Sequence, residues 1–111
     1  MSHYKQYVEE RRAPECGVIE NEYGFIEYKL FPELKEVMIC DLFVIPEKRN
    51  SGIGKQLEKL VIDKFKDECD YISCTVDITA NNAEHSLGVI MHTGYRLVRL
   101  SGTLIFLGKE L

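Results

Sequence analysis

One segment in the middle of the chain restricts the fold more than any other. An apolar run over residues 37–45 is interrupted only by Asp41 and is closed by Pro46. So continuous a run is typical of a central strand that is covered on both faces of a sheet. A short loop with Gly52 and Gly54 follows, and apolar residues then recur at the spacing of a helix. The segment therefore predicts a strand, a glycine loop and a helix in direct succession, which indicates an α/β sheet.

The helix after this loop is predicted over residues 52–65. One side carries its apolar residues, and most of its charged residues lie around the other side. The apolar residues are Ile53, Leu57, Leu60, Val61 and Phe65. Backbone N–H groups at the start of a helix are free, and the helix dipole favours an anion there. Since glycine also lets a ligand approach the backbone closely, the loop is a predicted phosphate-binding site.

The other segments predict further strands. Residues 17–21 and 23–30 are expected to form two strands with a tight turn between them, and residues 71–78 form another. Residues 95–100 and 103–107 are expected to form a C-terminal hairpin.

Two more helical segments complete the pattern. Residues 2–12 predict a short helix or a packed arm, and a later helix begins at Asn81 or Asn82, with Gly94 placed to end it. The residues that this later helix is expected to bury are Ala83, Leu87, Ile90 and Met91. From the first strand on, the order is β-β-β-α-β-α-β-β. It predicts a single mixed, mostly antiparallel sheet flanked by helices, in one domain of residues 1–111.

Composition argues against several kinds of function. Fourteen basic and 18 acidic residues give a net charge of −4, whereas a nucleic-acid partner requires a basic face. No stretch approaches the ~20 apolar residues of a membrane span, and residues 1–5 contain no apolar export segment, so we expect a soluble, cytoplasmic protein. No two cysteines form a C-x-x-C pair and six residues separate His85 from His92, so we expect no metal site.

The glycine loop can be compared with three kinds of phosphate loop. A Walker loop requires G-x4-G-K-[ST], but here the two glycines are too close together and Gln56 follows Lys55. A dinucleotide loop requires a third glycine where this chain has Leu57, although Asp77 supplies the acidic residue expected about 20 positions further on. A nucleotide-binding fragment is therefore a weaker alternative.

The third kind of loop is [RQ]-x-x-G-x-[GA] directly after a strand that reads L-x-V-x-P-E. The loop pattern is fulfilled by Arg49-Asn50-Ser51-Gly52-Ile53-Gly54, after a strand with Leu42, Val44, Pro46 and Glu47. With these residues the chain resembles the GNAT superfamily of acyl-CoA-dependent N-acyltransferases. Asn82-Ala83 through Gly94-Tyr95 is similar to the family's second motif, an Asn-led helix that ends in glycine and an aromatic residue. The resemblance covers residues 17–107 and implies a GNAT-like fold.

The resemblance implies a site for acetyl-CoA as co-substrate. The backbone of Leu42, Phe43 and Val44 would pair with the pantetheine arm. The pyrophosphate would be held by Arg49, Asn50, Ser51, Gly52, Ile53, Gly54 and Lys55, and the second motif would add Asn82. Local charge agrees, because residues 47–59 carry four basic against two acidic side chains, a net charge of +2.

The resemblance also implies N-acetyltransferase activity. In this reaction a primary amine attacks the thioester directly in a ternary complex, so the amine must lose a proton and the oxyanion must be stabilised. The N–H group of Val44 is the implied oxyanion donor. Asp77, at the end of a strand, is the first candidate for the base, and Asp41 is the second.

The chain departs from the family in two respects. Many members carry a tyrosine that protonates the leaving thiolate, and this chain has Ile90 at that position. The substitutes are His85, Ser86, His92 and Tyr95, and the alternative function is an acyl-CoA-binding or interaction module with weak or no catalysis. The two helices that usually follow the family's first strand, and that wall the acceptor site, are also missing. An open site favours a protein or peptide amine, and a homodimer would supply the wall.

Overall fold

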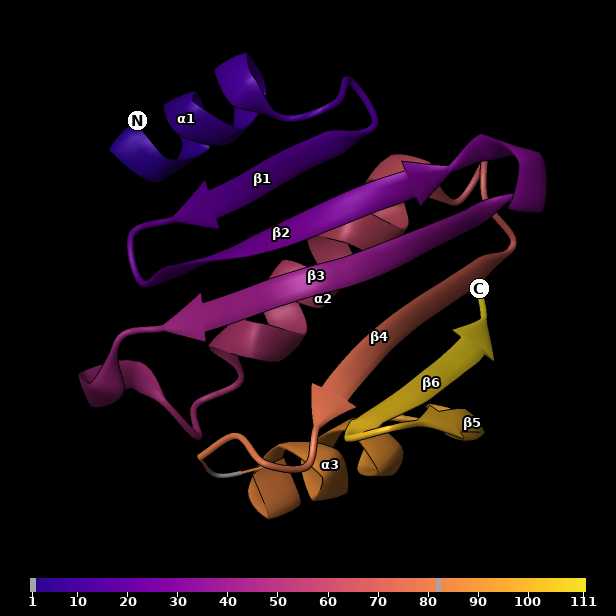
Figure 1. The fold of residues 1–111 in the computed structure, drawn as a ribbon. Helices are drawn as coiled ribbons and strands as arrows, with labels where there is room; N and C mark the ends of the chain where they lie inside the picture. The colour runs from indigo at the N-terminus through magenta and orange to yellow at the C-terminus, as the bar shows by residue number, and fades with distance from the viewer. Residues whose placement is uncertain (1, 82) are drawn as a thin grey trace.

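The computed structural model describes residues 2–81 and 83–111, which form one sheet with helices on both sides (Figure 1). The strands are β1 (Cys16–Asn21), β2 (Gly24–Phe31), β3 (Glu36–Val44), β4 (Tyr71–Asp77), β5 (Arg96–Ser101) and β6 (Leu104–Glu110). The helices are α1 (His3–Arg11), α2 (Ile53–Phe65) and α3 (Ala83–His92), with short 3-10 turns at η1 (Pro32–Leu34) and η2 (Pro46–Lys48). The predicted succession of strands and helices is confirmed.

The sheet has the strand order β1-β2-β3-β4-β6-β5. Among the described strands, β3 and β4 pair in parallel and the other neighbours pair antiparallel. The predicted mixed, mostly antiparallel sheet is therefore confirmed. Helix α2 makes the crossover between the two parallel strands, and the glycine loop connects the end of β3, through η2, to the start of α2.

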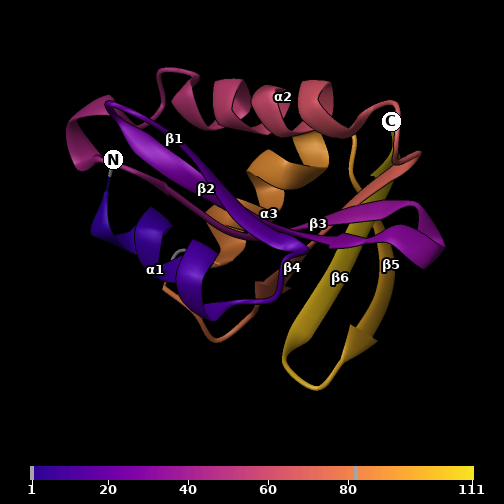
Figure 2. The ribbon, with the colours of Figure 1, turned by 90° about the horizontal axis from the view of Figure 1, so that it is seen from above.

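The core lies between the sheet and α2. Leu57 and Val61 of α2 are fully buried and belong to one apolar cluster with Ile72 of β4 and Leu107 of β6. Helix α1 lies on the opposite side of β1 and β2 from α2 (Figure 2). Its residue Val8 is fully buried, which anchors the helix to the sheet. The two faces of the β1–β3 region therefore carry different helices.

Strand β3 differs from its prediction in its second half. Val37 is fully buried, but Leu42 is 45% and Phe43 is 43% exposed, so the strand is not covered on both faces along its length. The parallel pairing with β4 is recorded from Glu36↔Tyr71 to Ile39↔Cys74, and in the described residues it goes no further. A register shift opposite Glu27 and Tyr28 leaves one extra residue in β3 at this point, which bends the strand. Beyond it, β3 and β4 separate.

Helix α3 agrees with most of its prediction. Ala83, Leu87 and Ile90 pack against the core, and Gly94, with φ +99°, follows the helix in the left-handed conformation that glycine allows. Met91 is 49% exposed, so its predicted burial is wrong: it lies one residue before the end of α3, where Ile90 still packs on the core cluster and Met91 does not. Within the described residues, no helix combines the length and the apolar character needed to cross a membrane.

Candidate functional site

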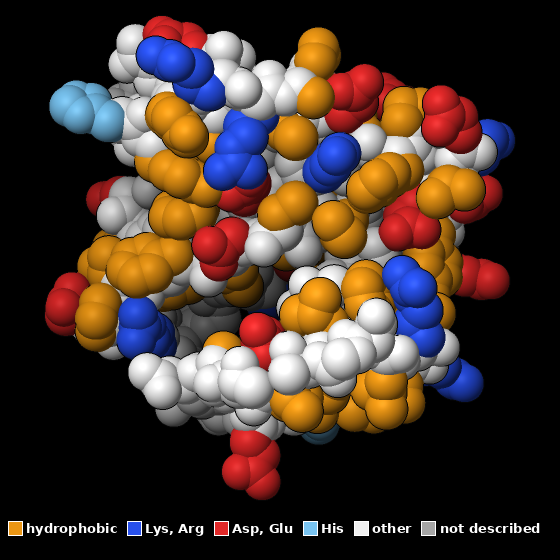
Figure 3. All heavy atoms as spheres, in the orientation of Figure 1, with side chains coloured by type: hydrophobic (Ala, Val, Ile, Leu, Met, Phe, Trp, Pro, Cys, Tyr) orange, Lys and Arg blue, Asp and Glu red, His pale blue; other side chains and the backbone are white. Residues whose placement is uncertain are grey.

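The separation of β3 from β4 opens a cleft of about 1110 Å³. Figure 3 shows the surface hollowed between β3 and α3, with acidic side chains at the rim. The cleft is lined by Leu42, Val44, Arg49, Asn50, Gly52, Ile53, Gly54, Lys55 and Asp77, together with Asp41. The structure thus brings most of the sequence-predicted site residues together. Phe43 and Ser51 are not part of the lining, and Asn82 lies outside the described residues.

The second half of β3 presents an open backbone edge to the cleft. The N–H of Ile45 donates to the carbonyl of Tyr23 at 2.8 Å, so it points toward β2. Backbone groups alternate along a strand, so those of Phe43 also point toward β2, and those of Leu42 and Val44 point toward the cleft. The open edge therefore belongs to Leu42 and Val44. Two of its groups are already engaged: the Leu42 N–H donates to Asp41 Oδ1 at 2.8 Å and the Val44 carbonyl accepts from Arg49, which leaves the Leu42 carbonyl and the Val44 N–H for a ligand. The backbone of Phe43, which was also expected to pair with pantetheine, faces β2 instead.

The start of α2 lies beside this open edge. Gly52 adopts φ +88°, no side chain caps the helix, and a Cβ at Gly52 would meet nothing within 4 Å. Asn50 also has a positive φ, of 64°, which asparagine tolerates better than most residues. The first N–H groups of α2 are therefore open to the cleft, and the site fits a phosphate-bearing ligand.

Basic side chains surround this helix start. Lys48, Arg49 and Lys55 line the cleft. Arg49 donates from Nε to the carbonyl of Val44 at 2.8 Å, and its guanidinium lies 5.6 Å from the ring centroid of Phe43. Only Nε makes this bond, so the Nη groups of the guanidinium remain donors for an anion in the cleft.

Asp77 lies across the cleft from β3 and forms a turn. Its Oδ1 accepts from the backbone N–H of Thr79 at 2.9 Å and from the Thr79 hydroxyl at 2.7 Å. These hydrogen bonds to the charged form lower the pKa of Asp77. The arrangement stabilises the turn after β4, and it makes Asp77 a weaker base than an unbonded carboxylate.

The inner end of the cleft holds a polar cluster. Tyr95 donates to Glu58 at 2.6 Å, and Lys109 lies 3.6 Å from the same carboxylate. Burial, followed by the bond to Glu58, raises the pKa of Tyr95 far above its ordinary value. The hydroxyl of Tyr95 is therefore engaged by Glu58. This argues against Tyr95 as the substitute for the family's tyrosine, whose position Ile90 occupies. Ile90 itself lines the cleft.

Two cysteines also line the cleft, Cys40 of β3 and Cys74 of β4. Desolvation raises the pKa of each thiol to about 11. Both are therefore almost entirely protonated at neutral pH, and neither is a good covalent nucleophile. Among the described residues, no three His, Cys, Asp or Glu side chains are grouped in a way that would hold a metal ion.

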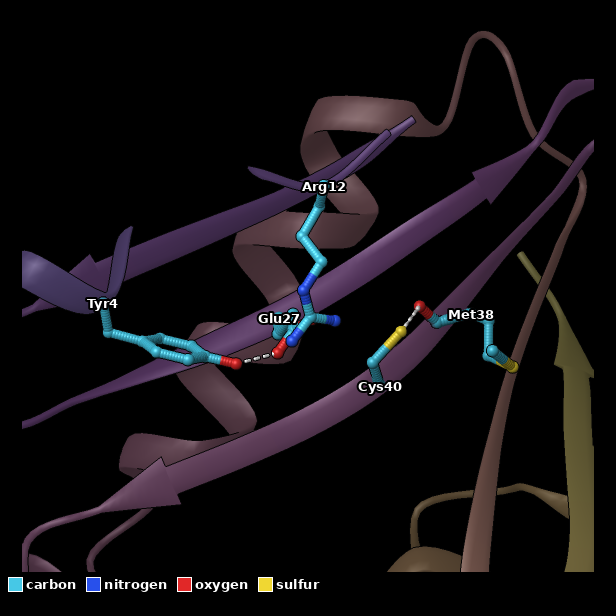
Figure 4. A network of polar contacts seen from close by, with 5 residues as sticks. All are labelled: Tyr4, Arg12, Glu27, Met38 and Cys40. Atoms are coloured by element: carbon cyan, nitrogen blue, oxygen red, sulfur yellow. Dashed lines mark hydrogen bonds and ion pairs between the residues drawn. The ribbon is translucent and has the colours of Figure 1, made fainter. Parts of the chain in front are cut away.

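Sequence reasoning missed a network on the other face of the sheet, under α1 (Figure 4). Glu27 of β2 is only 4% exposed; it accepts from the Tyr4 hydroxyl, and Arg12 lies 3.2 Å from its Oε2. The hydrogen bond to Glu27 is the main reason why the pKa of Tyr4 is raised to about 12. Tyr4 and Glu27 are 23 residues apart, so no local pattern signals this contact.

The pKa of Tyr4 predicts a loss of stability in alkali. Because the folded state raises this pKa above the ordinary value of 10, the contribution of Tyr4 is complete below pH 10 and is lost as the pH rises toward 12. Unfolding measured by denaturant between pH 9 and 12 should show a steeper loss for the wild type than for Tyr4→Phe. Equal slopes would show that the Tyr4–Glu27 bond does not form in solution.

The comparisons with known proteins agree with this geometry. Residues 2–87 match the acetyltransferase (GNAT) family. A search of curated proteins by sequence gave no match. In fold, the chain is similar to an acetyltransferase from Thermus thermophilus, with a TM-score of 0.79 and 18% identity over 96% of this chain and 70% of that one.

Two further solved structures share the fold. PaiA N-acetyltransferase from Thermoplasma acidophilum, in complex with coenzyme A, has a TM-score of 0.70 and 19% identity over 80% of this chain and 54% of that one. Arabidopsis thaliana Naa50, in complex with the bisubstrate analogue CoA-Ac-MVNAL, has a TM-score of 0.64 and 21% identity over 80% of this chain and 66% of that one. This chain thus spans only about half the length of the PaiA protein.

The fold is that of the acyl-CoA N-acyltransferases, as predicted, with the mixed sheet opened between its two parallel strands. The chain belongs to the GNAT acetyltransferase family.

Proposed function

We propose that this chain transfers an acetyl group from acetyl-CoA to a primary amine, by direct attack of the amine on the thioester in a ternary complex. One observation carries the proposal: the open edge of β3 and the uncapped, glycine-rich start of α2 line the same cleft. The open edge offers hydrogen bonds to a pantetheine arm, and the helix start offers N–H groups to a pyrophosphate. The N–H of Val44 is the proposed donor to the oxyanion.

Thermal unfolding with and without saturating acetyl-CoA tests this proposal. Ligand at 100 times its dissociation constant adds about 2.7 kcal/mol of stability, which raises the midpoint of a domain of this size by roughly 10 °C. ATP and NAD serve as controls, because a nucleotide-binding fragment would respond to them instead. No rise with acetyl-CoA would refute the assigned site.

The second candidate is an acyl-CoA-binding module without useful catalysis. It is favoured by Ile90, which lines the cleft at the position of the missing tyrosine, and by Tyr95, whose hydroxyl is engaged by Glu58. Both candidates bind acetyl-CoA, but only the enzyme releases coenzyme A thiol when an amine is added. A thiol-reactive dye therefore separates the two.

The acceptor belongs to the same proposal. An open acceptor side favours the amine of a protein or peptide. In the structure α1 packs on the face of the sheet opposite α2 (Figure 2), and we infer that it closes part of the acceptor side. The predicted homodimer stays a prediction.

A further inference from the structure

Three aromatic rings form a row where α1 meets the sheet: Tyr4 of α1, Phe25 of β2 and Phe43 of β3. The ring of Tyr4 packs on Phe25 with centroids 5.0 Å apart, and Phe25 stacks on Phe43 at 5.9 Å. Phe25 and Phe43 are directly opposite each other in β2 and β3, and Phe43 is 43% exposed. Phe43 is the partly exposed end of this aromatic row, and the guanidinium of Arg49 lies 5.6 Å from its ring centroid.

A pair of like charges lies beside the aromatic row. Glu27 and Asp41 are directly opposite each other in β2 and β3, an arrangement in which like charges destabilise a sheet. Arg12 pairs with Glu27, which is buried (Figure 4). In the part of the chain that the structure describes, no ion pair involves Asp41, which is exposed. The negative charge of Asp41 is therefore not balanced by an ion pair within the described residues.

Asp41 also lies at the boundary between this face and the cleft. It lines the cleft next to Leu42, two residues after Ile39, where the pairing of β3 with β4 stops. Its Oδ1 accepts from the N–H of Leu42 at 2.8 Å, and its other oxygen has no hydrogen bond within the described residues. Asp41 thus has one carboxylate oxygen available where the open strand edge meets the aromatic row.

We propose that Asp41 takes the proton of the acceptor amine and that the aromatic row binds an apolar group next to that amine. The proposal rests on the acetyl transfer proposed above and specifies its substrate class, a primary ammonium attached to an apolar or aromatic group. A cation at Asp41 neutralises the charge that Arg12 leaves unbalanced, and an apolar group covers the exposed ring of Phe43. Helix α1 would form one wall of this acceptor site, and the contacts of Tyr4 with Glu27 and Phe25 hold it against the sheet.

The ammonium gives one proton to the Asp41 carboxylate, which passes it to water. The neutral nitrogen forms a bond to the thioester carbonyl carbon, and the carbon–sulfur bond breaks with its electron pair on sulfur. The thiolate takes the second proton from the nitrogen. The products are the N-acetyl amide, coenzyme A thiol and one proton released to solvent.

The surroundings of Asp41 make its role measurable by pH. The ionisable groups near it include Tyr4 and Arg12 from α1, Glu27 from β2 and Cys40 beside it. The other walls of the cleft add Lys48, Arg49, Lys55, Glu58, Asp77, Glu84 and His92. The pKa of Cys40 is raised to about 11 and that of Tyr4 to about 12, so both stay protonated up to about pH 10.

The test compares Asp41→Asn with Asp77→Asn, using 2-phenylethylamine as the acceptor. Asparagine can keep the bond to the N–H of Leu42 but cannot take a proton, so Asp41→Asn should lower kcat about 100-fold at pH 7. The loss should shrink as the pH approaches the pKa of the amine, about 10.4 for a lysine-like amine, because free amine is then abundant. Asp41→Glu should restore part of the rate, and Asp77→Asn should lose less than Asp41→Asn.

Two binding measurements, the pH dependence of the rate and a control variant separate this role of Asp41 from a structural one. Asp41→Asn should keep the thermal shift with acetyl-CoA, and it should weaken binding of 2-phenylethylamine to the coenzyme A complex about tenfold in calorimetry. Asp63→Asn, on the exposed side of α2, should match the wild type in every assay. A loss that is equal at all pH values, or a larger pH-dependent loss in Asp77→Asn, would overturn the role of Asp41.

Acceptor selectivity tests the aromatic row. 2-Phenylethylamine should exceed ethanolamine at least tenfold in kcat/KM, and Phe43→Ala should remove most of this difference through KM. A peptide with N-terminal phenylalanine, compared with the same peptide bearing N-terminal aspartate, shows whether the ammonium comes from a small amine or a peptide. If acetyl-CoA stabilises the protein but ethanolamine or the aspartate peptide reacts best, the substrate class is wrong while the acetyl transfer stands. If no amine reacts, the acetyl transfer itself is refuted and the acyl-CoA-binding module is left.

Discussion

Replacing Gly54 with leucine should abolish the stabilisation by acetyl-CoA and leave the protein folded. Gly54 lies in the first turn of α2 and lines the cleft, so a larger side chain there takes up space that the pyrophosphate needs. The rise of roughly 10 °C expected for the wild type at saturating acetyl-CoA should fall to near zero.

The folded state should tolerate this change. A Cβ at Gly54 would lie 3.3 Å from Cδ2 of Leu42, the end of a flexible side chain that is 45% exposed and can move. Leucine is also a better helix former than glycine by up to about 1 kcal/mol. The unfolding midpoint without ligand should therefore change by only a few degrees.

Lys59→Leu is the matched control. It places the same side chain on the same helix, at a position whose side chain is 72% exposed and does not line the cleft. Its response to acetyl-CoA should equal that of the wild type. If Gly54→Leu keeps the full response, the pyrophosphate does not lie against the start of α2.

Features that depend on neighbouring residues were predictable from the sequence. The loop at Gly52 and the end of α3 at Gly94 both need the left-handed conformation that glycine adopts without strain, and both glycines have it. The period of α2 placed Leu57 and Val61 in the core for a similar reason, because a helix sets the spacing of its buried face locally.

Features that depend on distant partners were not predictable. The apolar run of β3 predicted a strand covered on both faces. In the structure the pairing of β3 with β4 ends at Cys74, so one edge of the second half of β3 is open. Leu42 and Phe43 are apolar and yet exposed, and both lie where a ligand is expected to pack. The contact of Tyr4 with Glu27 likewise joins a helix and a strand whose relation no local spacing records.

Gly24→Ala should destabilise the protein by about 3 kcal/mol, toward the upper end of the range for overpacking, and lower the unfolding midpoint by roughly 12 °C or more. A Cβ at Gly24 would lie 2.0 Å from the carbonyl oxygen of Phe43 and 3.0 Å from Cα of Val44. Both atoms belong to the backbone of β3, so no side-chain rotation relieves the clash. The strand has to move away from β2 along the part that forms the open edge.

The same substitution should therefore weaken acetyl-CoA binding at temperatures where the variant is still folded. Gly108→Ala is the control, because the nearest atoms to its Cβ would be the ring and hydroxyl of Tyr71, a half-buried side chain at the other end of the cleft strands. It should cost less stability than Gly24→Ala and leave the affinity for acetyl-CoA unchanged in calorimetry. Equal affinity in the two variants would mean that the position of β3 against β2 does not determine the geometry of the cofactor edge.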